Sequence, residues 1–355
     1  MKKNVHTAGK SRKQKKIMLL LLELLIILLL AIALFITTKL SKIEKNKLDM
    51  NDVSINDDLS DETKEAMAHY KTIALFGLDN RSNGSLSQRK SDVIMLANID
   101  TKQHTINLVS VYRDSYLDTG NGTYQKCNAA YAKGGPEQAL SMLNTNLDLA
   151  ITDYVTVDFN AIIECVDLLG GVDITITDDE ASLMIGYMKE LNELTGHNST
   201  PPASGGTYTL DGVQACAYAR IRYGGGDDYR RTERQRTVLT AMMQKAQKSN
   251  ILTLNKLINA AFGDIQTSFS NTDLLALATK VFSYDIGDTT GFPYEKTTHK
   301  YDKIGDVVIP CDLASNVTQL HQFLFNDENY TPSATVLSNS QQIISNTGYK
   351  QGDGH

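Results

Sequence analysis

One apolar run near the start of the chain constrains its architecture most. Residues 17–38 are 22 consecutive positions, nearly all Leu, Ile and Ala, with Glu23 as the only charged side chain. About 20 apolar residues suffice to cross the hydrocarbon core of a bilayer as a helix. A buried helix of a soluble protein normally keeps a polar face, which this run lacks. The sequence therefore predicts one transmembrane helix over residues 17–38.

The residues around this run predict its orientation and the division of the chain. Residues 1–16 hold seven Lys or Arg and no acid, and positively charged flanks stay in the cytoplasm. No small-residue cleavage site follows the run, so we expect an uncleaved anchor in the cell membrane with everything after it outside the cell. Residues 39–70 are polar and acidic and suit a stalk, residues 71–326 read as one folded domain, and residues 327–355 read as a disordered tail rich in Ser, Asn, Gln, Gly and Thr.

Charge and cysteine content exclude several classes of protein. From residue 39 onward the chain has 28 basic and 40 acidic residues, a net charge of −12. Duplex affinity depends mainly on cationic contacts to phosphate, so we expect no nucleic-acid partner. Four cysteines are too few for a small domain held together by disulfides.

Apolar patterns in residues 71–326 predict alternating strands and helices. Short apolar or alternating runs predict strands over 73–78, 93–99 and 106–112. A strand over 154–159, a helix to 169 and a strand over 172–176 together predict a β–α–β unit. We expect an α/β fold, an α-β-α sandwich around a central mixed sheet, preceded by the one transmembrane helix.

Six arginines fall within 17 residues of this acidic domain, at positions 220, 222, 230, 231, 234 and 236. Arg220 and Arg222 are two apart on a strand pattern over 215–222, so they are expected to share a face. A helix pattern over 228–248 places Arg231, Arg234 and Gln235 on one side of its first turns. A helix N-terminus and guanidinium groups both favour phosphate. A solvated basic face with salt bridges is an equally good interpretation of this cluster alone.

Acidic and basic residues also meet at the ends of three expected strands. Asp79 and Arg81 end the first, residues 89–92 open the second, and Arg113 and Asp114 follow the third. Each Asp alone would be an ordinary cap or turn residue. Carboxylates beside several cations are explained together if a divalent ion and a polyanion share one pocket, and magnesium prefers such hard oxygen ligands.

These segments resemble, in order and spacing, the LytR–CpsA–Psr family. The resemblance covers about residues 71–248 and rests on residues 75–81, 90–96, 110–114, 126–131 with Gly134 and Gly135, 154–171, 218–222 and 231–235. Members of the family are single-pass extracellular enzymes of Gram-positive and related bacteria. They move a glycopolymer, such as teichoic acid or capsule, from a polyprenyl-pyrophosphate carrier to peptidoglycan.

The resemblance implies a site and a cofactor. It implies that Asp79 and Asp92 ligate Mg²⁺. It also implies that the substrate pyrophosphate is bound by Arg81, Lys90, Arg113, Lys126, Arg220, Arg222, Arg231, Arg234 and Gln235. Three positions depart from the family pattern: Lys90 and Tyr112 stand where Arg and Pro are usual, and Arg230 stands where Gly is common.

The implied reaction is phosphoryl transfer, in which positioning and charge neutralisation dominate. A peptidoglycan hydroxyl attacks the sugar-linked phosphorus, with Arg113 and Asp114 as the catalytic pair; Asp114 either accepts the proton or orients Arg113. The partners implied are a polyprenyl-pyrophosphate-linked glycopolymer, peptidoglycan and membrane lipid. Two alternatives stay open: a hydrolase that cleaves the same pyrophosphate, and a non-catalytic polyprenyl-lipid-binding regulator of envelope assembly.

Two further features have two interpretations each. Apolar residues around 161–169 and 238–243 flank either a lipid groove or an ordinary core. Cys127 and Cys216 each adjoin one of the quoted segments, so they form either a disulfide or two buried free thiols.

Overall fold

The computed structural model describes residues 44–45, 52–78, 89–222, 228–250, 253, 256–257, 265–270, 273, 277 and 283–354. The chain divides into two compact units, Met1–Ile43 and Glu44–His355, and every described residue belongs to the second. The predicted span over residues 17–38 lies outside the described residues. Within the described part, no helix combines the length and apolarity that crossing a membrane requires.

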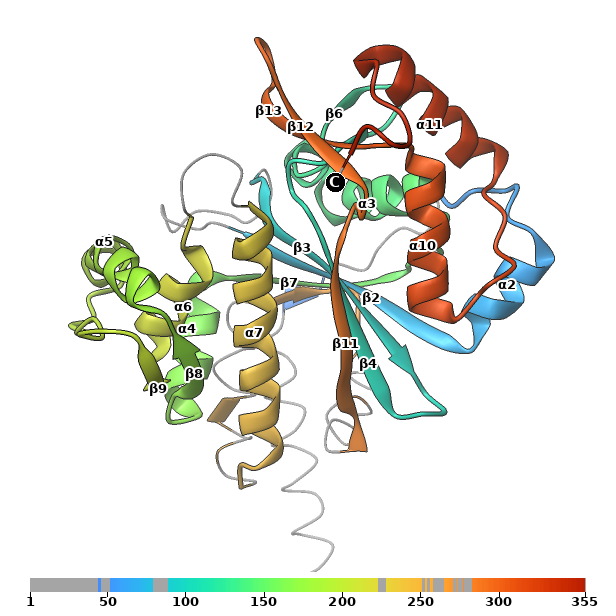
Figure 1. Cartoon of the computed structure of the whole chain (residues 1–355). Coiled ribbons are helices and arrows are strands. Elements are labelled where there is room, and N and C mark those ends of the chain that lie inside the picture. The colour runs from blue at the N-terminus through green and yellow to red at the C-terminus, as the bar shows by residue number, and fades with distance from the viewer. Residues whose placement is uncertain are drawn as a thin grey trace, which may run out of the picture. The chain divides into compact units, whose positions relative to one another are not determined.

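A seven-stranded mixed sheet forms the centre of the second unit (Figure 1). Its strands lie in the order β1(Glu44–Lys45), β10(Ile265–Thr267), β7(Asp153–Asp158), β2(Tyr70–Leu78), β3(Ser91–Asp100), β4(Thr105–Val111) and β11(Asp285–Phe292). β3 is antiparallel to both β2 and β4, while β2 with β7 and β4 with β11 are parallel. The expected strands over 73–78, 93–99, 106–112 and 154–159 are confirmed, and so is the central mixed sheet.

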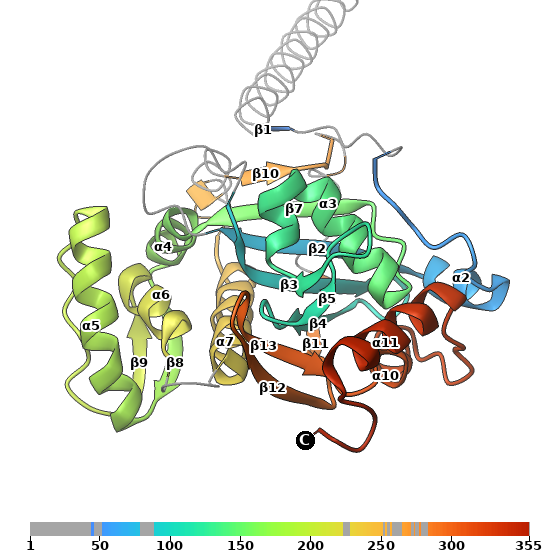
Figure 2. The same cartoon turned by 90° about the horizontal axis from the view of Figure 1, so that it is seen from above.

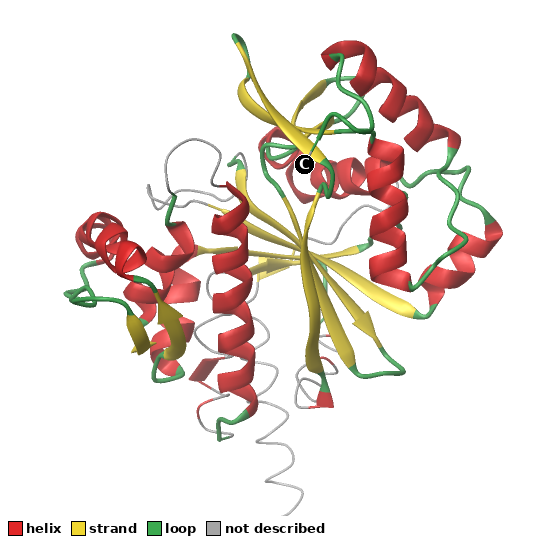
Figure 3. Cartoon of the chain, in the orientation of Figure 1, coloured by secondary structure: helices red, strands yellow, loops and turns green. Residues whose placement is uncertain are grey.

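Alternating side chains of β3 divide the sheet into two apolar faces. Ile94 and Leu96 join a core that also contains residues of α3(Ala129–Leu147), α10(Leu313–Phe325) and α11(Ala334–Thr347). Met95 and Ala97 point to the other face, where Leu239 of α7(Asp228–Gln247) packs. Successive residues of a strand point to opposite sides, so helices cover both faces (Figures 1 and 3). The α-β-α sandwich follows directly from this alternation.

A second core lies beside the sheet, and its topology contradicts the predicted β–α–β unit. It joins α4(Phe159–Leu168), α5(Asp178–Thr195), α6(Gly212–Arg220), α7 and the antiparallel strand pair β8(Val172–Ile176) and β9(Gly206–Leu210), which Figure 2 shows grouped together. The predicted β–α–β unit is wrong, because β8 pairs with β9 in a separate two-stranded sheet and does not return to the central one.

The predicted strand over 215–222 is also wrong, because this segment is helical. α6 begins with a capping box in which the Asp211 side chain accepts from the Gln214 N–H and the Gln214 side chain accepts from the Asp211 N–H. This pair satisfies two backbone donors that a helix start leaves open. The helix expected over 228–248 is confirmed as α7.

Residues at both ends of the predicted domain pack on it, although we expected a stalk and a disordered tail. Asn56 is buried and donates to Asp148, at the end of α3. Tyr330 and Ser333 donate to the same carboxylate, and Ser333 caps α11. Residues 52–60 and α11 therefore belong to the folded unit, because their polar groups have buried partners that the sequence does not reveal. α2(Asp61–Ala68) also belongs to it, because Ala66 and Met67 pack against the first core.

Two small hairpins complete the unit, and none of the four cysteines forms a disulfide. β5(Tyr116–Asp118) pairs with β6(Tyr124–Lys126), and β12(Lys296–Tyr301) pairs with β13(Gly305–Pro310). Cys127 lies in the first core and Cys216 in the second, so the disulfide considered between them does not form.

Candidate functional site

Three strand ends meet at one edge of the central sheet. β2 ends opposite the start of β3, with Leu78 paired to Ser91, and β4 ends beside the first residues of β3 because those two strands are also antiparallel. Asp92 at the start of β3 and Arg113 just after β4 are therefore neighbours. The Arg113 Nη1 donates to Asp92 Oδ1.

Asp114 lies between two cations. Its Oδ2 is 3.6 Å from Arg113 Nε, and its Oδ1 is 3.0 Å from Lys126 Nζ, at the end of β6. Burial by itself lowers the pKa of Arg113, but Asp92, then Asp114 and Asp228, raise it above its ordinary value. Arg113 is thus held as a cation by three carboxylates.

Asp228, the first residue of α7, collects guanidiniums around one oxygen. Its Oδ1 lies 2.7 Å from Arg231 Nη2, 3.6 Å from Arg222 Nη2 and 3.8 Å from Arg113 Nε. Burial raises the pKa of Asp228 to about 6; Arg113 and Arg222 oppose this, and the carboxylates of Asp114 and Asp92 add to it. We call Asp92, Arg113, Asp114, Lys126, Arg222, Asp228 and Arg231 the charged cluster.

Asp228 was absent from the residues predicted by resemblance. Its position was the available signal, because an acid at a helix start between Arg222 and Arg231 has cations on both sides in the sequence. The structure brings six of the predicted residues close together, with Asp228 as a seventh that the prediction omitted.

Two predicted pyrophosphate ligands have partners on α5. Arg234 is 5% exposed and donates to Glu180 Oε1 at 2.8 Å and to the Ile221 carbonyl at 3.2 Å. Arg220 lies 3.2 Å from Glu190 Oε2. Arg220 ends a helix, so the expectation that it shares a strand face with Arg222 is wrong. Both guanidiniums link α5 to the rest of the second core.

Other predicted residues differ in what the structure says of them. Asp79 and Arg81 lie outside the described residues, and Lys90 is exposed. Tyr112, at the position where the resemblance expects Pro, donates its backbone N–H to the Phe292 carbonyl of β11. Proline has no N–H, so this departure adds a hydrogen bond next to Arg113.

The described residues supply a partial donor set for a metal. No three His, Cys, Asp or Glu side chains among them converge as ligands. Asp92 Oδ1 accepts from Arg113, whereas no described residue donates to Asp92 Oδ2, and the side chain is 27% exposed. A carboxylate oxygen with no donor among the described residues, on a partly exposed side chain, fits Mg²⁺, which keeps several waters and needs few protein ligands.

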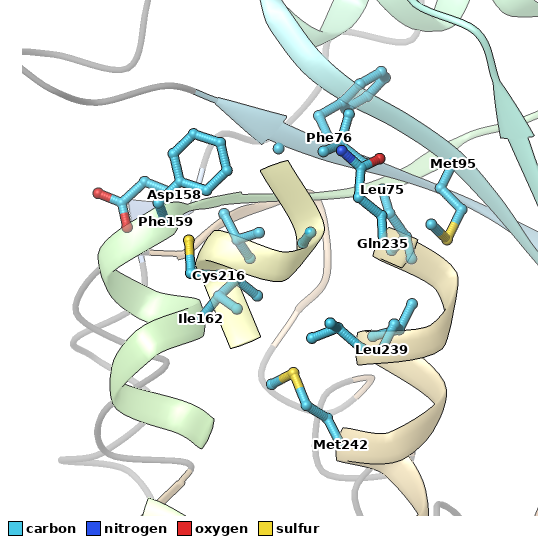
Figure 4. Close-up of a pocket in the computed structure, with 15 residues that line it drawn as sticks. Leu75, Phe76, Met95, Asp158, Phe159, Ile162, Cys216, Gln235, Leu239 and Met242 are labelled. Carbon is cyan, nitrogen blue, oxygen red and sulfur yellow. The ribbon is translucent and has the colours of Figure 1, made fainter. Parts of the chain in front are cut away.

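An apolar cavity lies between the central sheet and helices α4, α6 and α7 (Figure 4). Its empty volume is about 760 Å³, open space at its mouth included. Strands β2, β3 and β7 and helices α4, α6 and α7 line it. The side chains labelled in Figure 4 include Phe76, Met95, Ile162, Leu239 and Met242. This lining confirms a groove between the two apolar segments, with only some of their residues facing it.

Helix α7 connects the cluster to the cavity. Arg231 and Gln235 are one turn apart, and Leu239 and Met242 continue the same side of the helix. Gln235 lines the cavity, and its Oε1 is buried without a hydrogen-bond partner among the described residues. Val93, which follows Asp92, lines the cavity as well. The arrangement offers cations for an anionic group and, directly beside them, an apolar space for a hydrocarbon chain.

Comparison with known proteins places this geometry in a family. A model of the LytR_cpsA_psr family matches residues 31–302. The Enterococcus faecalis protein TagU, named a polyisoprenyl-teichoic acid–peptidoglycan teichoic acid transferase, is 30% identical over 210 residues, covering 58% of this chain and 64% of the relative. Bacillus subtilis TagT, which bears the same functional name, is 28% identical over 239 residues, covering 66% of this chain and 71% of the relative.

Solved structures share the fold. One described as TagT bound to LI-WTA has a TM-score of 0.61 and 21% identity, covering 80% of this chain and 100% of the other. Another, described as the LytR-CPS2A-psr family protein YwtF (TagT) with bound octaprenyl pyrophosphate lipid, has a TM-score of 0.55 and 22% identity, covering 79% and 99%. The chain spans slightly under two thirds of the E. faecalis relative and about half of B. subtilis TagV. With a family match over most of its length, the chain belongs to the LytR_cpsA_psr family.

Proposed function

We propose that this protein is a membrane-anchored extracellular transferase. It moves a glycopolymer from a polyprenyl-pyrophosphate carrier to peptidoglycan and leaves a phosphodiester bond. The observation that carries the proposal is the continuity of the charged cluster and the apolar cavity along α7. A lipid pyrophosphate has the matching two halves, an anionic head and a long apolar chain. The names of the relatives support the same substrate class.

The charged cluster acts on the pyrophosphate through position and charge. Arg231 precedes the cavity residue Gln235 by one turn of α7 and shares Asp228 with Arg222, so these two arginines would bind the phosphate next to the lipid, and Arg113 and Lys126, which share Asp114, would bind the phosphate next to the sugar. Guanidiniums pair with phosphate oxygens in two-pronged contacts, and the charge on these oxygens spreads in the transition state. A peptidoglycan hydroxyl attacks the sugar-linked phosphorus, and polyprenyl phosphate leaves toward the cavity.

Magnesium completes the charge balance in this proposal. The cluster already contains three carboxylates against four cations, so a pyrophosphate would bring an excess of negative charge. Asp92, with Asp79 from the resemblance, would hold Mg²⁺, which neutralises phosphate oxygens when bound. This role leaves the guanidiniums as the groups that orient the two phosphates.

Of the two roles considered for Asp114, orientation fits the geometry better. Both of its oxygens face cations, Arg113 on one side and Lys126 on the other. A carboxylate that is engaged twice holds the two cations at a fixed separation, which suits two phosphate oxygens. Asp114 is therefore a positioning residue for Arg113 and Lys126.

A transferase would attach the glycan to the cell wall, whereas a hydrolase would release it into solution. Full-length protein in bilayer nanodiscs would receive a labelled polyprenyl-pyrophosphate glycan, Mg²⁺ and purified peptidoglycan sacculi. We expect label in the sedimented wall fraction, and none there with Arg113→Ala. Free phosphorylated glycan at the same rate with and without sacculi would establish the hydrolase. Binding of the lipid without turnover would establish the regulator.

A further inference from the structure

Aromatic side chains form a surface that the proposed function does not use. Tyr116 of β5 stacks on Tyr301 of β12, with ring centroids 6.1 Å apart and an interplanar angle of 26°. Tyr124 of β6 lies 6.0 Å from Tyr116, and His299 lies 4.5 Å from Tyr301 and 6.0 Å from Tyr349, which follows α11. We call these five residues the aromatic surface.

The aromatic surface is continuous with the charged cluster. Tyr116 and Lys126 are directly opposite each other in the β5–β6 hairpin, so their side chains share a face. Lys126 Nζ contacts Asp114, and it lies 3.8 Å from the position that a Cβ on Gly305 would take, at the turn of the β12–β13 hairpin. The backbone N–H of Val308 also donates to the Asp114 carbonyl. The hairpin therefore rests on the residue that positions two cations of the cluster.

The aromatic surface and the cavity are connected to different residues of the charged cluster, Lys126 and Arg231. The cavity is lined by the central strands β2, β3 and β7 and by second-core residues of α4, α6 and α7, whereas Tyr116, Tyr124, Tyr301 and Tyr349 pack on the first core. Contacts lead from the cavity through Arg231, Asp228, Arg113, Asp114 and Lys126 to Tyr116. In phosphoryl transfer the attacking and leaving oxygens are roughly in line. If the lipid phosphate leaves toward the cavity, the other reactant approaches from the aromatic side.

The exposure and polar neighbours of the rings fit a sugar. Tyr124, Tyr301 and Tyr349 are partly exposed and His299 is exposed. The Tyr124 hydroxyl donates to Asn339 Oδ1 at 2.8 Å, and the Tyr116 hydroxyl accepts from Asn346 Nδ2 at 3.3 Å. Aromatic faces are electron-rich and attract the polarised C–H groups of a pyranose ring, while amides bond to its hydroxyls.

The charge of the β12–β13 hairpin argues against a polyanion as the ligand. Residues 296–306 contain three lysines and two aspartates, a near balance. The lipid already has an apolar cavity and the pyrophosphate already has the charged cluster. The remaining chemical group is a glycan, and both the donor and the acceptor of the proposed transfer contain one.

We propose that the aromatic surface binds a pyranose glycan strand and guides it to the reacting phosphate. This inference rests on the proposed function for the identity of the reaction, but the binding surface can be tested separately. Tyr301 and His299 contribute stacking faces, and Tyr116 supports the ring of Tyr301. Tyr349 follows α11 and adds a further partly exposed ring beside His299.

Co-sedimentation of the full-length protein in nanodiscs tests the proposal with two probes. One is peptidoglycan sacculi stripped of secondary polymers, and the other is purified secondary glycopolymer without lipid, fixed to beads. The variants are Tyr301→Ala and His299→Ala, with Tyr301→Phe to restore the ring. Matched controls outside the surface are Tyr208→Ala on β9 and His197→Ala after α5. Loss of one stacking contact is expected to weaken binding about tenfold.

We expect weaker binding in Tyr301→Ala and His299→Ala, and binding within about twofold of wild type in Tyr301→Phe and both controls. Loss on sacculi alone identifies the acceptor strand, and loss on the secondary polymer alone identifies the donor strand. Unchanged binding of both probes by His299→Ala and by a folded Tyr301→Ala would overturn the proposal. Exposed His299 keeps the test valid if Tyr301→Ala unfolds.

Binding of geranylgeranyl pyrophosphate to the same samples separates the two proposals. All variants of the aromatic surface are expected to bind it like wild type, because the cluster and the cavity are intact. Wild-type protein that retains sacculi through Tyr301 and binds no prenyl pyrophosphate would refute the transferase while supporting the aromatic surface. Normal binding of the prenyl pyrophosphate, together with glycan binding that does not change in the Tyr301 and His299 variants, would refute the aromatic surface while supporting the transferase.

Discussion

Replacing Asp228 with Asn should stabilise the protein at neutral pH, although three guanidiniums contact this carboxylate. The pKa of Asp228 is raised from 3.8 to about 6, because burial penalises the charge more than the arginines favour it. The side chain is only 14% exposed, so solvent screens this penalty little. A shift of about two pH units corresponds to ~3 kcal/mol between the two protonation states. We expect Asp228→Asn to gain up to about that free energy of unfolding at pH 7.5.

The pH dependence gives the sign independently. When pH falls from 7 to 4, the folded protein takes up a proton at Asp228 before the unfolded chain does, so wild-type stability rises through this group. Above pH 7 the ionised form is present in both states and the burial penalty is complete. The Asn variant cannot titrate, so its advantage should be largest above pH 7 and should disappear near pH 4.

Calorimetry of the full-length protein in detergent between pH 4 and 8 measures this difference. Asp173→Asn is the control, because Asp173 is an exposed acid whose pKa is lowered by its hydrogen bond with Thr209 and by Lys245. Any small difference in unfolding free energy between Asp173→Asn and wild type should disappear toward low pH, and Asp173→Asn should not be more stable than wild type at pH 7.5. Destabilisation of Asp228→Asn at pH 7.5 would mean that its attraction to the arginines outweighs burial. Such a result would refute the prediction that burial of the carboxylate dominates.

Four further outcomes are expected from the same geometry. Arg113→Ala should reduce transfer by about 10²–10³-fold, since it removes charge stabilisation at the phosphate; single-turnover rates of the folded variant would measure this loss. Arg234→Ala should instead cost about 3–5 kcal/mol of folding free energy, because it leaves Glu180 buried without its cationic partner. Chemical denaturation would measure this loss, and unchanged stability would contradict the structural role of Arg234. Leu239→Asp should weaken binding of geranylgeranyl pyrophosphate and leave inorganic pyrophosphate binding intact, a contrast that titration calorimetry can test. Chelation with EDTA should stop transfer and added Mg²⁺ should restore it, whereas full activity in EDTA would exclude the metal.

Strand positions in this protein were predictable because their cause is local. A strand with one buried face alternates apolar and polar residues, and a strand with two buried faces is apolar throughout. Residues 93–99 and 106–112 show these patterns and match the observed strands to within a few positions. The boundaries differ from the prediction by only a few residues. The segment 215–222 failed because its alternation imitates a strand, while the decisive helix signal, Asp211 with Gln214, lies just before it.

The sequence indicated which residues could belong to the candidate site, but not which side chains each of them contacts. Local sequence placed Asp92, Arg113 and Arg231 near strand ends and a helix start, where an anion site is plausible. It could not separate Arg231, which contacts Asp228 three residues away, from Arg234, which pairs with Glu180 at a separation of 54 residues. Both arginines have the same spacing pattern on α7, and only the position of α5 distinguishes them.

The sequence by itself determined the acidic character of the bulk of the chain, the alternating strands and the order of the family segments. It also supports the prediction of a membrane span over residues 17–38. The tertiary structure decided which cations form the charged cluster, where α7 joins that cluster to an apolar cavity, and that α11 and residues 52–60 pack on the domain. The physical reason is the range of the interactions involved: strand patterns and charge depend on neighbours in the chain. Buried ion pairs and cavity walls instead require side chains from elements that only folding brings together.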